Sequence, residues 1–259
     1  MTWHHVRRMG LALAAAVALA APVAAQAQIA GDTVSYQVNG RKYQGYYAHN
    51  PQISGDKPVV LILHDWDGLG AYERRRARML AEEGYAAFAA DLYGKGVRPD
   101  TLAAKKARSG ELYQDRAAMR ARMAGALDRI ASLPGADPDS VVAIGYCFGG
   151  AAALELARTG RDLDGFVSFH GGLGTPEGQD YADVQGEILI LHGSQDSVSG
   201  MDALANLAGR LDAADVTYDM QVYGGARHAF TVWGGDRYQA RADLRAWDAL
   251  LRFLARKLP

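Results

Sequence analysis

The chain has 259 residues, of which 49% are hydrophobic, and its 28 basic residues nearly balance 29 acidic ones, for a formal net charge of −1. This balance argues against nucleic acid as a partner, because nucleic-acid-binding proteins carry a basic surface. The single cysteine excludes a disulfide within the chain, and the apolar content is sufficient for the core of a large globular domain.

The first 27 residues have the layout of a secretory signal. Arg7 and Arg8 precede an apolar run over residues 9–21, and small residues end at Ala25-Gln26-Ala27. The run is shorter than the roughly 20 residues of a membrane-spanning helix, and an A-x-A cleavage site follows it. We therefore expect cleavage after Ala27, export to the periplasm or the medium, no stable membrane anchor after cleavage, and one domain over residues 28–259.

The remaining sequence alternates strand and helix patterns. Residues 33–38 and 43–48 alternate apolar and polar side chains around Asn39-Gly40, which predicts a β-hairpin. Continuous apolar runs predict strands buried on both faces at 59–64, 85–91, 141–145, 165–170 and 187–193. Helical patterns cover 71–83, 101–133 with a break near Gly110, 148–158, about 200–213, and 236–257.

This alternation predicts an α/β fold with a mostly parallel central sheet, helices on both faces and the hairpin at its edge. Ligands of open α/β sheets bind outside the carboxyl ends of the strands. We therefore expect the functional residues directly after the apolar runs.

The motif GYCFGG, residues 145–150, joins a buried strand to a helix. Its glycines remove the clashes of a sharp strand-to-helix turn known as a nucleophile elbow. At this position the helix N-terminus favours the thiolate of Cys147, and the backbone N–H of Phe148 is free to donate to an oxyanion. Cys147 is thus the predicted nucleophile; an inert buried cysteine and an intermolecular link are the alternatives.

A thiol nucleophile needs a base and a group that orients the base. In elbow-type hydrolases the chain order is nucleophile, acid, histidine. Asp196 follows the strand at 187–193, and His228 lies in a glycine-rich loop after the last strand, so they are the predicted acid and base. Asp164 and Asp180 also follow Cys147, but neither ends a core strand in the required order.

The other histidines of the core, His64, His170 and His192, stand at strand ends, where an imidazole commonly hydrogen-bonds loop backbone. We expect them to be structural or to support the catalytic residues from behind. No H-E-x-x-H motif, paired CxxC or clustered His/Asp spacing is present, so no metal is predicted.

In combination, several segments resemble the dienelactone hydrolase (carboxymethylenebutenolidase-like) family of the α/β-hydrolase fold: LHDWDGLGAYERRRARMLAEEGYAAFAADLYGKG, IGYCFGG, FVSFHGGL, ILILHGSQD and YGGARHAF. The resemblance extends from about residue 35 to the C-terminus. It implies a Cys147–His228–Asp196 triad, an acidic residue at Asp65 that contacts the resting thiol and helps to form the thiolate when substrate arrives, and the Trp66 N–H as an oxyanion donor beside Phe148. The family more often has glutamate at the position of Asp65.

Family members that act on dienelactone hold the substrate carboxylate with arginines, one of them shortly after the catalytic histidine. Here that segment reads HAFTVWGGDR, and neither Arg227 nor Arg237 matches the family pattern. Arg98 and Arg108 follow the strand at 85–91, where we expect solvated surface positions.

The predicted reaction is hydrolysis of a small ester or lactone through a thioester acyl-enzyme, without a cofactor, by a monomer. Aromatic side chains are predicted to line an apolar pocket: Trp66, Tyr93, Tyr146, Phe148, Phe230 and Trp233. Alternatives are a general carboxylesterase or thioesterase, a binding protein that kept the fold without the chemistry, and peroxide or disulfide chemistry at the thiol, which would not require Asp196 and His228.

Overall fold

The computed structural model describes residue 1 and residues 28–258. The predicted secretory signal occupies residues 2–27, outside the described residues, and stays a prediction. Among the helices that the structure describes, none is both long and apolar enough to cross a membrane.

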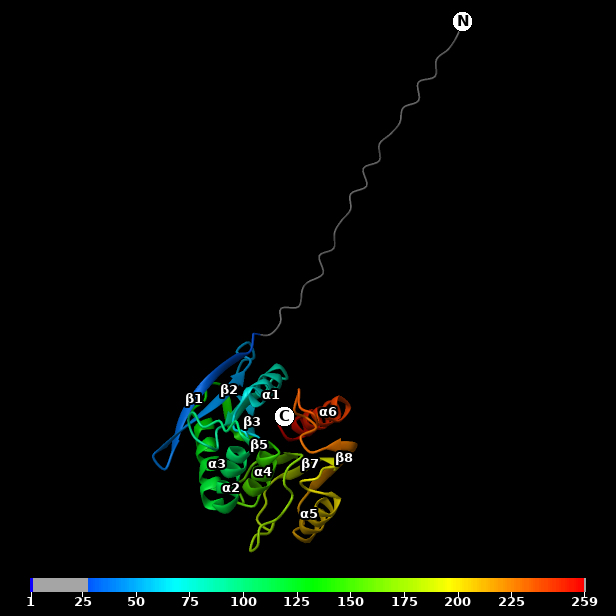
Figure 1. Cartoon of the computed structure of the whole chain (residues 1–259). Helices are drawn as coiled ribbons and strands as arrows, with labels where there is room; N and C mark the ends of the chain where they lie inside the picture. Colours follow the sequence, from blue (N-terminus) through cyan, green and yellow to red (C-terminus); the bar gives the residue numbers. More distant parts are fainter. Residues whose placement is uncertain (2–27, 259) are drawn as a thin grey trace.

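In the described part of the chain, eight strands form one sheet in the order β1-β2-β4-β3-β5-β6-β7-β8. Their bounds are β1 Ala30–Val38, β2 Arg41–His49, β3 Lys57–Leu63, β4 Ala86–Ala90, β5 Ala136–Tyr146, β6 Gly165–Phe169, β7 Glu187–Gln195 and β8 Tyr218–Arg227. Strands β3 to β8 all run parallel to one another. Strand β2 pairs antiparallel with both β1 and β4. The predicted mostly parallel sheet with a hairpin at its edge is confirmed (Figure 1).

The hairpin turn follows from its two central residues. Asn39 and Gly40 both have positive φ, 49° and 75°, which is the requirement of a tight type I′ connection between twisted strands. The turn brings β2 back along β1 over its full length, from Val38 opposite Arg41 to Ala30 opposite His49.

Within residues 28–258, six helices connect or follow the strands: α1 Ala71–Glu82, α2 Leu102–Gln114, α3 Arg116–Ile130, α4 Phe148–Ala157, α5 Met201–Ala213 and α6 Ala240–Lys257. The helical stretch after β4 breaks at Asp115, so the predicted break near Gly110 is wrong. Asp115 leaves helical geometry (φ −108°, ψ 80°), and its carboxylate accepts the Ala118 N–H at 2.8 Å as an N-cap. Gly110 stays inside α2, because a helix tolerates one glycine at modest cost.

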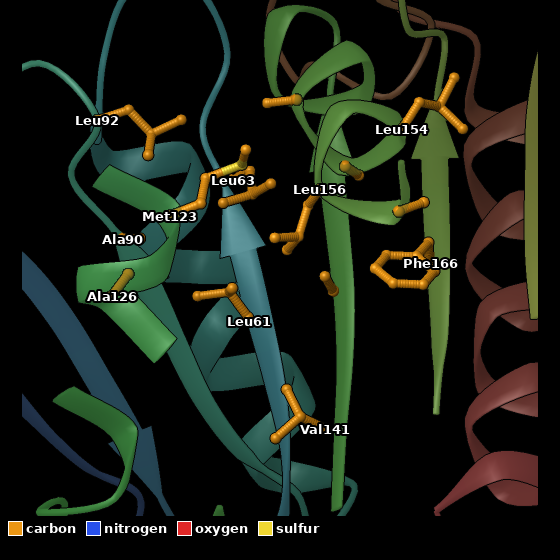
Figure 2. Packing of buried hydrophobic residues seen from close by; sticks show 14 of the residues in the cluster. Leu61, Leu63, Ala90, Leu92, Met123, Ala126, Val141, Leu154, Leu156 and Phe166 are labelled. Carbon is orange, nitrogen blue, oxygen red and sulfur yellow. The ribbon is translucent and has the colours of Figure 1, made fainter. Parts of the chain in front are cut away.

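Alternate residues of the central strand β3 enter two different cores. Leu61 and Leu63 pack in the core covered by α2, α3, α4 and α5, together with Met123 of α3 and Leu154 of α4 (Figure 2). Val60 and Ile62 point to the opposite face, which α1 and α6 cover. Burial on both faces explains why the strand sequence is a continuous apolar run.

The parallel strands bring their carboxyl ends to one edge of the sheet. Asp65 comes two residues after β3, Cys147 directly after β5, Asp196 directly after β7, and His228 directly after β8. These four side chains come from distant parts of the sequence, and the sheet places them at a common edge.

Candidate active site

Cys147 lies in a strained turn between β5 and α4. Its φ of 53° and ψ of −109° fall in a region that residues other than glycine rarely adopt. A Cβ on Gly145 would lie 1.9 Å from the carbonyl oxygen of Gly149, and one on Gly149 would lie 2.0 Å from that of Leu63. Only glycine fits at these two positions, which is the geometry expected of a nucleophile elbow.

The structure brings Cys147, His228 and Asp196 into one hydrogen-bonded chain. His228 Nε2 is 3.0 Å from Cys147 Sγ, and His228 Nδ1 is 2.8 Å from Asp196 Oδ2. A carboxylate accepts, so Nδ1 of a neutral His228 carries the proton and donates it to Asp196. The lone pair of Nε2 then faces the thiol and is available to take its proton.

Asp196 is held as a carboxylate by the loop after β7. Its Oδ1 accepts the backbone N–H groups of Val198 at 2.8 Å and Ser199 at 3.0 Å, which leaves Oδ2 for His228. Burial favours the neutral acid, but the hydrogen bonds from His228 and from the two amides outweigh it and lower the pKa of Asp196. Asp196 is therefore ionised at neutral pH.

Burial and the neighbouring Asp65 both favour the neutral form of the Cys147 thiol. Burial raises the pKa of the Cys147 thiol well above its ordinary value, and the nearby Asp65 carboxylate, which accepts a hydrogen bond from the thiol, raises it further. The Phe148 N–H acts in the opposite sense by stabilising the thiolate. Burial also raises the pKa of Asp65, to about 6, with Asp67 contributing in the same direction.

A second buried carboxyl, Glu73 of α1, fixes the loop that carries Asp65. Its two oxygens accept the backbone N–H groups of Asp65 at 3.3 Å and Gly70 at 2.7 Å. Burial raises the pKa of Glu73 to about 7, and the backbone hydrogen bonds offset part of that rise. Sequence reasoning missed Glu73, although its place three residues after Gly70 fits a carboxyl that caps the first turn of α1.

The Trp66 N–H donates to Oδ1 of the Asp65 side chain. Asp65 therefore occupies a predicted oxyanion donor as well as the thiol. An oxyanion reaches both amides only when the Asp65 carboxyl leaves Trp66.

The sequence pattern of the dienelactone hydrolase family matches residues 44–258. The chain belongs to the dienelactone hydrolase family. A protein of Bradyrhizobium sp. named "Probable 2-oxo-3-(5-oxofuran-2-ylidene)propanoate lactonase" is 28% identical over 236 residues, which cover 87% of this chain and 94% of that protein.

Two solved structures are similar throughout. The structure titled m3DLH is 34% identical, with a TM-score of 0.83, and covers 89% of this chain and 99% of its own. A dienelactone hydrolase-like promiscuous phosphotriesterase from metagenomic libraries is 32% identical, with a TM-score of 0.84 and the same coverage. These similarities confirm that the chain has the α/β-hydrolase fold of the dienelactone hydrolase family.

A cavity of about 220 Å³ opens beside the thiol. Its walls are Asp65, Trp66, Ser109, Tyr113, Cys147, Phe148, Val198, His228, Ala229 and Arg237. Cys147 and His228 both line the cavity, so a bound carbonyl group has direct access to the predicted nucleophile and base.

Of the six aromatic residues predicted to line this cavity, only Trp66 and Phe148 do so. Tyr146 stacks on Phe169 in the core on the α1 and α6 side, because successive residues of a strand point to opposite faces. Tyr93 is buried and donates its hydroxyl to the Trp66 carbonyl at 2.9 Å. Phe230 packs against His170, and Trp233 packs against the Arg76 guanidinium.

Sequence reasoning missed four wall residues: Ser109, Tyr113, Val198 and Ala229. Ser109 and Tyr113 are four residues apart and share one face of α2, which lies across the strand ends. Arg237, which does not match the arginine positions of the family, nevertheless lines the cavity. By contrast, Arg108 pairs with Glu111 on the surface, and Arg98 lies 3.7 Å from Asp91.

His64 and His192 contact backbone groups of the loops after β3, β4 and β7. His64 contacts the Asp65 carbonyl oxygen at 2.6 Å and accepts the Leu92 N–H at 3.0 Å, and His192 contacts the Ser199 carbonyl oxygen at 2.7 Å. Asp164 accepts the Val141 N–H of β5 at 2.7 Å, and Asp180 accepts the Ala182 N–H at 3.0 Å. Within residues 28–258, no three His, Cys, Asp or Glu side chains gather as metal ligands would.

Proposed function

We propose that the protein hydrolyses a small ester or lactone through a thioester acyl-enzyme on Cys147. The observation that carries this proposal is the chain of contacts from Asp196 through His228 to the thiol, at 2.8 and 3.0 Å, on the wall of a cavity. A nucleophile, a base and a group that orients the base are the three parts that covalent acyl transfer requires.

In the acylation half-reaction, His228 Nε2 takes the thiol proton, and the thiolate attacks the carbonyl carbon of the substrate. The carbonyl oxygen becomes an oxyanion that accepts the N–H groups of Phe148 and, once the Asp65 carboxyl has moved, of Trp66. Collapse of this intermediate breaks the C–O bond, and the leaving alkoxide takes the proton from His228. The product of this step is a thioester on Cys147; in a lactone the alcohol remains tethered to the acyl group.

In the deacylation half-reaction, His228 removes a proton from water, which attacks the thioester carbonyl. The carbon–sulfur bond breaks, the thiolate recovers its proton, and the acid product leaves. Asp196 stabilises the imidazolium that forms in both halves of the reaction, since its carboxylate accepts the Nδ1–H bond throughout.

The walls of the cavity support an acyl group that is apolar and carries one negative charge. Trp66, Tyr113, Phe148 and Val198 provide the apolar surface, and Arg237 is the cation among the wall residues. Arg237 lies 4.0 Å from the exposed Asp236, a contact that leaves the guanidinium free to bind a carboxylate.

The proposal is tested by measuring hydrolysis of cis- and trans-dienelactone, an aryl acetate and an aryl thioester by the purified wild-type chain and the Cys147→Ala and His228→Ala variants. Tyr47→Phe is the control, because it deletes a buried hydroxyl that donates to the Pro134 carbonyl far from the site. Lactone turnover that is lost in both site variants and kept in the control is the expected result.

Aryl ester or thioester turnover lost in both site variants, with no lactone turnover by any protein, would support a general esterase or thioesterase. Equal rates in wild type and variants, or no turnover of any substrate, would contradict catalysis at Cys147 and favour a binding protein on this fold.

A further inference from the structure

A second histidine packs against His228 and has no role in the proposed acyl transfer. His170 directly follows β6, is fully buried, and has a φ of 39°. Its ring lies edge to face with that of His228, with centroids 5.5 Å apart at an interplanar angle of 67°.

A chain of hydrogen bonds leads from His170 to α1. His170 Nε2 lies 2.7 Å from Thr231 Oγ1, which lies 2.7 Å from the Tyr72 hydroxyl. Arg76 Nε donates to the same Tyr72 oxygen at 3.2 Å. Arginine can only donate, so the arrangement that leaves fewest groups unpaired has Tyr72 donating to Thr231 and Thr231 donating to His170 Nε2.

The direction of these hydrogen bonds defines the tautomer of His170. With Nε2 as acceptor, the neutral ring carries its proton on Nδ1, which has no hydrogen-bond partner among the described residues. Burial lowers the pKa of His170 well below its ordinary value, and the neighbouring His228 lowers it further. A histidine that stays neutral in this way does not exchange protons with the reaction, so any contribution it makes is through position.

The far end of the chain is fixed by a buried ion pair. Arg76 of α1 pairs with Asp243 of α6, and the exposed fractions of the two side chains are 1% and 6%. Arg76 Nη2 also donates to the Thr231 carbonyl oxygen at 3.2 Å, and its guanidinium lies 4.0 Å from the centre of the Trp233 ring. Arg76 thus holds the main chain of the loop at residues 228–233, called the histidine loop below, against both helices.

We propose that Thr231 and His170 are positioning residues that hold the ring of His228 in line with Cys147, with Arg76 and Asp243 as their anchor. The inference rests on the proposed function for its catalytic meaning. The histidine loop needs such support, because Ala229 next to the base has a φ of 65°, a conformation that alanine adopts only under constraint from its surroundings. Removing the Thr231 hydroxyl leaves the Tyr72 O–H and His170 Nε2 unpaired. The His170 ring is then free to turn, and with it the His228 ring that it contacts.

The test compares Thr231→Val, which keeps the shape and deletes the hydroxyl, with Thr231→Ser, which keeps the hydroxyl. Tyr72→Phe interrupts the same chain one step earlier, and Tyr47→Phe is the matched control for loss of a buried tyrosine hydroxyl. Two experiments are made on each protein: steady-state hydrolysis of the aryl acetate, which gives kcat and KM, and alkylation of Cys147 by iodoacetamide as a function of pH, which needs no substrate. Thermal unfolding shows whether each variant is folded.

Thr231→Val is expected to lower kcat about tenfold with KM within about twofold of wild type, because loss of alignment affects the reaction more than binding. Thr231→Ser should recover most of the rate, Tyr72→Phe should lose about threefold, and alkylation near neutral pH should slow in the same order. Tyr47→Phe should match wild type in both measurements.

Folded Thr231→Val and Tyr72→Phe proteins with wild-type kcat and alkylation profiles would overturn the inference, as would equal losses in Thr231→Val and Thr231→Ser. If Thr231→Val does not fold, the contrast between Tyr72→Phe and Tyr47→Phe decides. A wild-type protein that turns over no ester contradicts the proposed function alone, and the alkylation profiles then decide the positioning role.

Discussion

The nucleophile elbow and the histidine loop hold their key residues by different means. At the elbow, backbone contacts are so close that Gly145 and Gly149 admit no side chain, and the position of Cys147 follows from main-chain geometry. In the histidine loop the ring of His228 is held by side chains from three other elements, through Asp196, His170 and the Arg76–Thr231 contact.

This difference predicts how each region responds to mutation. Steric exclusion at the elbow is all or none, because an added Cβ meets backbone that cannot move aside. Side-chain support in the histidine loop is graded, because each hydrogen bond contributes a limited amount. Substitutions at the elbow should therefore affect folding, and substitutions around His228 should affect the rate of a folded enzyme.

The largest effect is expected from Gly149→Ala. Its Cβ would lie 2.0 Å from the Leu63 carbonyl oxygen, so β3 and α4 must separate, and we expect loss of the folded protein or a destabilisation of about 4 kcal/mol or more. Gly110→Ala is the control, because a Cβ there meets nothing within 4 Å inside α2 and should stabilise by about 0.5–1 kcal/mol. Chemical denaturation measures both, and a Gly149→Ala protein as stable as wild type would contradict the steric account.

Asp196→Asn should leave the fold intact and lower kcat about a thousandfold. An amide that donates toward His228 Nδ1 stabilises the wrong tautomer, in which Nε2 carries a proton and cannot accept one from the thiol. Steady-state hydrolysis of an aryl ester measures the loss, with the exposed Asp180→Asn as control. A loss below about tenfold would show that His228 does not depend on Asp196 for its orientation.

Glu73→Gln tests the carboxyl that fixes the Asp65 loop. The pKa of Glu73 rises from 4.5 to about 7 on folding, so the folded protein keeps a proton that the unfolded chain releases. Its contribution to stability is complete below pH 4.5 and is lost as pH rises toward 7, by about 3 kcal/mol.

The Glu73→Gln protein should therefore lose less stability than wild type between pH 4.5 and 7. Urea denaturation across this range gives the two slopes. The exposed Glu111→Gln variant should keep the wild-type slope, and identical slopes in all three proteins would contradict the assignment.

A smaller effect is expected from Asp65→Asn. Removing the carboxylate takes away one cause of the raised pKa of Cys147, so alkylation by iodoacetamide near pH 7 should accelerate about tenfold while ester turnover falls. Alkylation rates as a function of pH measure this shift. Slower alkylation in Asp65→Asn would show that the carboxylate promotes the thiolate at rest instead of suppressing it.

The same contrast explains what the sequence could predict. The prediction of Cys147 rests on glycines at fixed spacing between an apolar run and a helix, a pattern that has one steric meaning. The strand order then indicates Asp196 and His228, and the structure places both in one hydrogen-bonded chain with Cys147. The sequence pattern favours a helix break at Gly110, whereas the helix ends at Asp115. The difference arises because an aspartate that caps the next helix is a stronger signal than a single glycine.

The walls of the cavity were not predictable in the same way. Tyr113 and Arg237 reach the cavity because of how α2 and the segment after the histidine loop lie across the strand ends, and periodicity does not specify that packing. The prediction that Tyr146 lines the cavity is wrong, because its ring stacks on Phe169 in the core on the α1 and α6 side. The contact of His170 with His228 joins residues 58 positions apart, which no local pattern indicates.

The central claim is that Cys147 forms a covalent acyl intermediate, and rapid acid quenching followed by peptide mass spectrometry tests it most directly. Wild-type protein mixed with an aryl ester should carry one acyl group, on the peptide that contains Cys147, and Cys147→Ala should carry none and turn over no ester. Ester turnover by Cys147→Ala, or an acyl group found only on another residue of the wild type, would contradict the account.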